Sequence, residues 1–319
     1  MTRHPRLVAA ALAAAGCVVA ALAAVEQNPG DRFAGVELTV VPVAGNVHMV
    51  TRPGGGGNIG MSAGPDGVLL VDSLFAPLAE RLIAAVRTVS DGEIRFLVNT
   101  HVHPDHIGGN GPLAAADVLI FAHDNLRARM LDRLRTPRRG GGFSPRPAAG
   151  ARPVVTYNDT VSFHLNGEVV RAFLAPPAHT DGDTFVHFPE SDVLHLGDVF
   201  RTTSYPIIDV YNGGTLAGTV EALETAIRLA GPDTRVIPGH GLEVVGRDAM
   251  VEFLDMIVDV RDRVHDLISE GRTLDEVMAA APTAAYDARW GQEATWTAND
   301  FVPIVYHELG GGSLYRGGE

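Results

Sequence analysis

Short apolar runs separated by turn residues fill residues 36–72, which predicts strands and hairpins. The run VELTVVPV (36–43) comes first, and a Gly-Pro-Asp-Gly turn at 64–67 separates two later runs. The spacing then changes, because PLAERLIAAVRTV (77–89) carries apolar residues at helical intervals. EIRFLVNT (93–100) is predicted to be a strand that leads directly to His101. The chain therefore starts with β structure, followed by one helix and one strand.

The remaining chain repeats this order of strands, helix and strand. Strands are predicted at 117–123, 154–177, 183–198 and 235–240, and helices at 124–134, 215–231, 247–270 and from Thr273, which caps its helix. Residues 135–153 are rich in Gly, Pro and Arg and predict a loop. The pattern predicts an α+β fold, with two packed sheets and helices outside. Because no clear linker follows residue 245, we expect residues 246–319 to form a helical extension packed on the domain at 36–245.

The first 25 residues have the pattern of a signal peptide. Arg3 and Arg6 precede an uncharged run at 7–25, and Ala21-Leu22-Ala23 offers small residues for cleavage. We expect export to the periplasm or secretion. An uncleaved anchor is the first alternative, since 19 such residues can just span a bilayer. A lipoprotein modified at Cys17 is the second, although the apolar run continues past that cysteine.

Charge and cysteine content restrict the chemistry. The chain has 25 Lys and Arg against 38 Asp and Glu, a net charge of −13, so its field repels nucleic acid. We therefore expect a small-molecule substrate, with membrane contact only through an uncleaved N-terminus; the oligomeric state is not predicted. Cys17 is the only cysteine, and cleavage after Ala23 removes it. Any metal must then be bound by His, Asp or Glu.

The segment NTHVHPDHIGGNGP (99–112) concentrates four candidate metal ligands on a loop at the end of a predicted strand: His101, His103, Asp105 and His106. Burying four such groups without a partner would cost several kcal/mol. His101 and His103 project to the same side of an extended chain, because side-chain direction alternates. This segment is therefore predicted to bind metal.

Three more candidate ligands follow predicted strands: His179 in PPAHTDGD, Asp198 at the end of VLHLGD, and His240 at the end of VIPGH. The expected ligand sets are His101, His103 and His179 for one ion, Asp105, His106 and His240 for a second ion, and Asp198 as a bridge. A three-histidine set with an open fourth position is typical of hydrolytic zinc. The nitrogen and oxygen ligands favour two Zn²⁺ per chain, with Mn²⁺ or Fe²⁺ as alternatives.

These seven positions resemble the signature of the metallo-β-lactamase superfamily, His-x-His-x-Asp-His followed by His, Asp and His. The resemblance extends over residues 36–245 and implies a four-layer αββα sandwich, with the site at one edge between the sheets. An aspartate at position 198 is more similar to glyoxalase II and the lactonases than to the lactamases proper. The predicted export fits β-lactams better, because these compounds act in the periplasm.

The leading functional hypothesis is an exported dinuclear zinc hydrolase, in which a metal-bridging hydroxide opens a cyclic amide or ester. Asp105 is expected to ligate the second ion and to orient the nucleophile or carry its proton. The positive charge of two zinc ions favours an anionic substrate, which Arg201 could bind through a carboxylate. Arg201 could equally be a solvated loop residue. The alternatives are a lactonase or a glyoxalase II-like thioesterase, then a mononuclear iron enzyme that oxidises sulfur compounds, and last a non-catalytic metal-binding protein.

Overall fold

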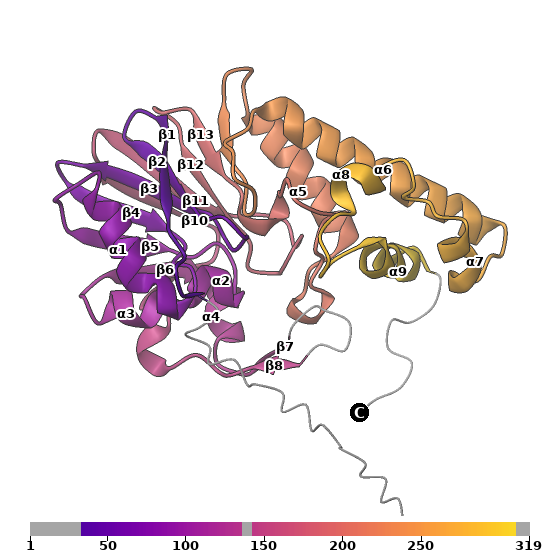
Figure 1. Ribbon diagram of the computed structural model, residues 1–319, viewed down its shortest axis with the longest axis horizontal. Helices are drawn as coiled ribbons and strands as arrows, with labels where there is room; N and C mark the ends of the chain where they lie inside the picture. The colour runs from indigo at the N-terminus through magenta and orange to yellow at the C-terminus, as the bar shows by residue number, and fades with distance from the viewer. Residues whose placement is uncertain (1–32, 136–141, 311–319) are drawn as a thin grey trace, which may run out of the picture. The chain divides into compact units, whose positions relative to one another are not determined.

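A seven-stranded sheet is built from residues 39–157 (Figure 1). The computed structural model describes residues 33–135 and 142–310, so the predicted signal peptide at 1–25 lies outside the described residues. In spatial order the strands are β1 (Thr39–Ala44), β2 (Val47–Thr51), β3 (Ile59–Gly64), β4 (Gly67–Val71), β5 (Ile94–Val98), β6 (Leu119–His123) and β9 (Val155–Tyr157). Strands β1 to β4 pair antiparallel, whereas β4, β5, β6 and β9 pair parallel.

A second sheet has five strands: β10 (Thr160–Leu165), β11 (Glu168–Leu174), β12 (Thr184–Phe188), β13 (Val193–His195) and β14 (Arg235–Ile237). The pairs are antiparallel except for β13 and β14, which are parallel. Parallel neighbours need a crossover connection, and α5 (Leu216–Leu229) lies within it. Because β13 and β14 run in the same direction, the residues that follow them meet at one edge of the sheet.

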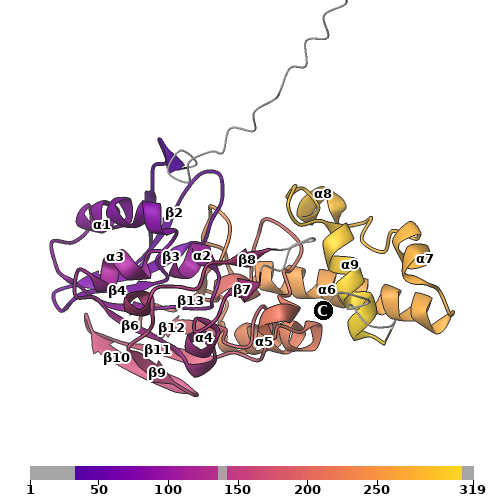
Figure 2. The same cartoon turned by 90° about the horizontal axis from the view of Figure 1, so that it is seen from below.

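The two sheets pack face to face through an apolar core, to which Met49 and Val71 contribute from one sheet and Val186 from the other. Side chains alternate along a strand, so the neighbouring Phe185 faces the opposite side and packs with helices. Helices α1 (Ala79–Arg87) and α3 (Asn110–Ala114) lie beyond the first sheet, and α5 and α6 (Arg247–Ser269) beyond the second (Figure 2). The predicted α+β, four-layer αββα sandwich is confirmed.

The predicted helices at 77–89, 215–231 and 247–270 are confirmed as α1, α5 and α6. Three segments differ from prediction. The helix expected at 124–134 ends early, as α4 (Asp124–Arg129), and the expected loop at 135–153 includes the short pair β7 (Leu134–Arg135) and β8 (Phe143–Ser144). The metal-binding segment is also more ordered than a loop, since α2 (Pro104–Ile107) forms one turn of helix with proline in its first position.

The C-terminal helices share a core with the second sheet. Phe253 of α6 contacts Phe200 edge to face, with 5.5 Å between ring centroids, and both belong to the cluster that contains Phe185. The helices that follow are α7 (Leu274–Ala279), which Thr273 caps as predicted, α8 (Asp287–Trp290) and α9 (Ala298–Glu308). Within the described residues, every helix is too short or too polar to cross a bilayer.

The shared core predicts that the C-terminal helices unfold together with the sheets. Phe253→Ala should lower the free energy of unfolding by about 3–5 kcal/mol, because it removes a fully buried ring. Urea unfolding followed by circular dichroism and by tryptophan fluorescence should give one coincident transition. The control Glu252→Ala, on the exposed face of α6, should change stability by less than about 1 kcal/mol. Separate transitions for helices and sheets would contradict this account.

Candidate metal centre

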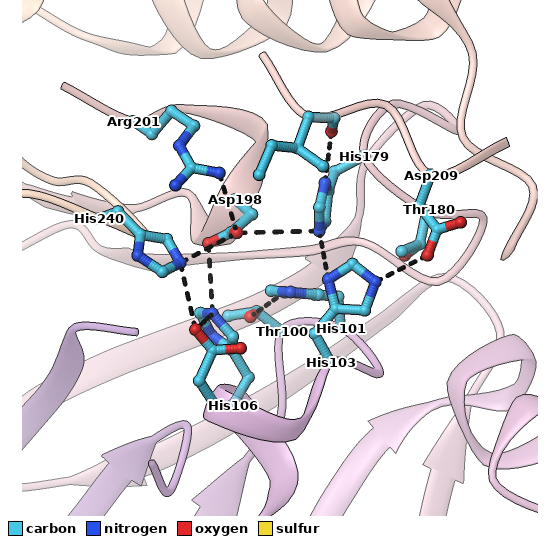
Figure 3. Close-up of polar contacts among 12 residues, drawn as sticks. Thr100, His101, His103, His106, His179, Thr180, Asp198, Arg201, Asp209 and His240 are labelled. Carbon is cyan, nitrogen blue, oxygen red and sulfur yellow. Dashed lines mark hydrogen bonds and ion pairs between the residues drawn. The ribbon is translucent and has the colours of Figure 1, made fainter. Parts of the chain in front are cut away.

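Segments that follow strands at one edge of the sandwich bring all seven predicted ligands together. All of them except Asp105 are labelled in Figure 3. The HVHPDH segment follows β5, and His179 lies between β11 and β12. Asp198 lies in a short 3-10 turn after β13, and His240 lies just beyond β14. The structure forms two ligand groups, each with its ligand atoms within 4.8 Å of one another: His101, His103, His179 and Asp198 in the first, and Asp105, His106 and His240 in the second.

Hydrogen bonds on the outer side of the first group determine which nitrogens face inward. The Thr100 hydroxyl lies 3.0 Å from Nδ1 of His101, which leaves Nε2 of this histidine buried and without a hydrogen-bond partner in the described chain. Nδ1 of His179 donates to the carbonyl of Ile207 at 2.5 Å. The inward Nε2 of His179 lies 2.8 Å from Nδ1 of His103. Such outer hydrogen bonds fix the tautomer in which the inner nitrogen is free to bind metal.

Asp198 lies between the two groups. Its Oδ2 is 3.1 Å from Nε2 of His240 and 3.8 Å from Nε2 of His179, and its Oδ1 is 3.2 Å from Nε2 of His106. Within the second group, Oδ2 of Asp105 lies 3.4 Å from Nε2 of His240. One buried carboxylate thus faces nitrogens of both groups, which is the position required of a bridging ligand.

The donor set fits metal ions. Within the described residues, Nε2 of His101, Nε2 of His106 and Oδ1 of Asp198 are buried without a hydrogen-bond partner. Leaving such atoms unpaired is costly, and cations bound in the two groups would satisfy all three. Neutral imidazoles and ionised carboxylates are the forms that bind metal. These residues could therefore hold a metal ion in each group.

The charge states of His179 and Asp198 agree with this assignment. Burial and the neighbouring His103 lower the pKa of His179 to about 3, so its ring is neutral. Burial opposes ionisation of Asp198, but the charges of His240 and His106 outweigh that effect and hold the pKa of this carboxyl well below its usual range. Burial likewise disfavours charged His106, yet Asp198 and Asp72 raise its pKa well above the usual value. The surrounding carboxylates thus stabilise positive charge at this point.

Asp72 supports the second group and was missed by the sequence analysis. Its carboxylate accepts hydrogen bonds from the amide and hydroxyl of Thr100, at 2.7 and 2.6 Å, and lies 2.7 Å from Nδ1 of His106. One buried side chain therefore orients His106 directly and His101 through Thr100. The signal in the sequence was an aspartate directly after the fully buried strand GVLLV.

Asp209 supports the first group and was also missed. Its Oδ2 lies 2.7 Å from Nε2 of His103, and its amide donates to the carbonyl of His179 at 2.9 Å. The turn that holds it ends at Gly213 and Gly214, where a Cβ on Gly214 would lie 2.3 Å from the His179 carbonyl oxygen. The available signal was an acidic residue followed by two glycines, which is weak because turns on protein surfaces look the same.

Arg201 is not the solvated loop residue that was one alternative, because only 2% of it is exposed. Its Nη1 lies 3.8 Å from Oδ2 of Asp198, and its Nη2 lies 3.3 Å from Oε2 of Glu293 in the C-terminal region. Its backbone also pairs with that of His240. Contact with a substrate carboxylate stays a prediction.

The contact with Asp209 predicts a role in metal binding. Asp209→Asn removes the charge that makes His103 a stronger ligand, so Zn²⁺ affinity should fall by about tenfold or more. Competition titration against a chelator measures the affinity, and Asp233→Asn, at an exposed position, is the matched control. An affinity equal to that of the control would show that Asp209 does not tune the site.

Comparisons with known proteins match this geometry. A family model described as the metallo-β-lactamase superfamily matches residues 52–240, more than half of the chain. A linear primary-alkylsulfatase of Pseudomonas sp. (strain ATCC 19151) is 25% identical over an alignment of 256 residues, and the match covers 68% of this chain and 48% of the relative. The chain thus spans about half the length of that relative.

Solved structures show the same fold. A metallo-β-lactamase from Pontibacter korlensis matches with a TM-score of 0.57 and 17% identity, over 70% of this chain and 100% of the other. The stereoselective inverting sec-alkylsulfatase Pisa1 from Pseudomonas sp. matches with a TM-score of 0.64 and 18% identity, over 87% of this chain and 51% of the other. From the family match and the fold, we conclude that this chain belongs to the metallo-β-lactamase superfamily.

Proposed function

We propose that the chain is an exported dinuclear zinc hydrolase that opens a cyclic amide or ester in a small anionic substrate. The observation that carries this proposal is the pair of complete ligand groups that meet at Asp198. Two groups favour two ions over the single iron of the sulfur-oxidising alternative. Export rests on the pattern of residues 1–25, which lie outside the described structure.

Bound zinc ions would acidify a water molecule and polarise the bond to be cleaved. The first would be held by His101, His103 and His179, the second by Asp105, His106 and His240, with Asp198 between them. Asp105 is suited to a further role in proton transfer. Its side chain is 19% exposed, more than that of Asp198, so it can meet both the centre and a substrate. Burial opposes its ionisation, but His106 and His240 outweigh this and lower its pKa, so the side chain is held as the ionised carboxylate.

Arg201 supports an anionic substrate. Its Nε and Nη1 have no hydrogen-bond partner in the described part of the chain, although the side chain is buried beside the centre. A guanidinium with unpaired N–H donors can bind a carboxylate or a sulfate through two parallel hydrogen bonds. The positive charge of bound zinc would act in the same direction.

A sulfate ester is the second candidate substrate. The curated relative is a linear primary-alkylsulfatase, and the match to Pisa1 covers 87% of this chain. Residues 1–245 make up less than 87% of the chain, so the match to Pisa1 must include part of the C-terminal helices after residue 245. The Pontibacter lactamase is matched over its full length by 70% of this chain. The C-terminal helices are thus a feature that favours an alkyl sulfate over a β-lactam.

A substrate panel tests the proposal. Zinc-loaded protein should hydrolyse at least one of nitrocefin, a carbapenem or an acyl-homoserine lactone, and it should contain two zinc ions per chain by metal analysis. Chelation should abolish the activity, and added Zn²⁺ should restore it. Lactoylglutathione tests the thioesterase alternative and dodecyl sulfate the sulfatase candidate. Activity on dodecyl sulfate alone would contradict the proposal of a cyclic substrate and support an alkyl sulfate. One metal ion per chain would contradict the dinuclear centre.

Asp105→Asn tests the proposed proton acceptor. Loss of the charged acceptor should lower kcat by about 10²–10⁴-fold, the usual contribution of general acid–base catalysis. The thermal unfolding temperature should stay close to that of the parent protein, and Asp91→Asn, at an exposed site, should retain full activity. A fully active Asp105→Asn protein would remove this residue from the mechanism.

A further inference from the structure

We propose that Glu293, in the C-terminal helical region, is a positioning residue for the metal centre. It holds the guanidinium of Arg201 back from Asp198, and so leaves the Asp198 carboxylate free to bind metal. This inference goes beyond the proposed reaction, because it concerns how the centre is loaded and does not depend on which bond is cleaved.

The guanidinium of Arg201 lies between two carboxylates. Its Nη2 is 3.3 Å from Oε2 of Glu293, whereas its Nη1 is 3.8 Å from Oδ2 of Asp198. The shorter contact is also a hydrogen bond, and the longer one is not. Figure 3 shows the guanidinium directed toward Asp198 from the side opposite to the first histidine group. Arg201 is therefore held mainly by Glu293 while it remains within reach of the metal ligand.

A buried charge must be neutralised by a partner, and two carboxylates, Glu293 and Asp198, lie within 4 Å of the Arg201 guanidinium. If Glu293 lost its charge, Asp198 would be the remaining carboxylate within 4 Å among the described residues. The guanidinium would then move toward Asp198 and form hydrogen bonds with its oxygens. Oδ2, which also faces His240, would be occupied by the arginine. Each oxygen held in this way is withdrawn from metal binding.

Glu293 is itself oriented by the C-terminal region. The hydroxyl of Thr295 donates to its Oε1 at 3.0 Å, which leaves Oε2 for Arg201. The amide of Trp296 donates to the carbonyl of Glu293, and the buried indole of Trp296 donates to the carbonyl of Pro206 at 3.1 Å. This chain of contacts connects the segment between α8 and α9 to Arg201 and, through Arg201, to Asp198.

The test is the Zn²⁺ affinity of Glu293→Gln, which keeps the shape of the side chain but removes its charge. Competition titration of the full chain against a chelator should show affinity reduced by about tenfold or more, as for other residues that orient metal ligands. Glu252→Gln is the matched control, because Glu252 pairs with Arg289 at 2.8 Å in the same region. It should bind zinc like the parent protein, and an equal affinity in both variants would overturn the proposal.

A double-mutant cycle tests whether the effect passes through Arg201. In an Arg201→Gln background, Glu293→Gln should cause no further loss of zinc affinity, because the competing cation is gone. A loss of the same size in that background would overturn the proposed route. Glu293→Asp keeps the charge and should retain more affinity than Glu293→Gln; equal losses would also contradict it. The visible spectrum of bound Co²⁺ should change in Glu293→Gln, and an unchanged spectrum at saturation would show that Asp198 is not disturbed.

Discussion

Asp198 is buried among two groups of histidines and one arginine, and its charge must be compensated from several directions at once. Three strands of the fold end at the same place. Asp198 follows β13, and His240 follows its parallel neighbour β14. The HVHPDH segment follows β5 of the other sheet. None of these elements is near the others in sequence. The packed core between the sheets therefore has a functional consequence, because it holds the strand ends close enough for one carboxylate to face both groups.

The sequence predicted the candidate ligands best, and the structure brings these residues together. Metal ligands have few possible side chains, and here each follows a strand, so their type and place in the sequence were both informative. The alternation of apolar residues was similarly sufficient to predict the two sheets and the helices α1, α5 and α6. The ligands, the strands and these helices could all be predicted for the same reason. Apolar periodicity and strand ends depend on only a few adjacent residues.

The supporting residues could not be predicted in the same way. Asp72 acts through Thr100 and His106, and Asp209 through His103, so their roles exist only once distant segments have packed. Glu293 is more remote, since it reaches the centre from the C-terminal helices through Arg201. An acidic residue in a turn is common on any protein surface. The sequence therefore identified the candidate ligands but not the residues that orient them.

The central claim is that one carboxylate, Asp198, serves two metal ions. Anomalous diffraction from crystals of the zinc-loaded protein, recorded at the zinc absorption edge, tests this most directly. The account predicts two anomalous peaks per chain, one beside His101, His103 and His179 and the other beside Asp105, His106 and His240, with Asp198 in contact with both. A single peak, or two peaks with Asp198 bound to neither ion, would contradict it.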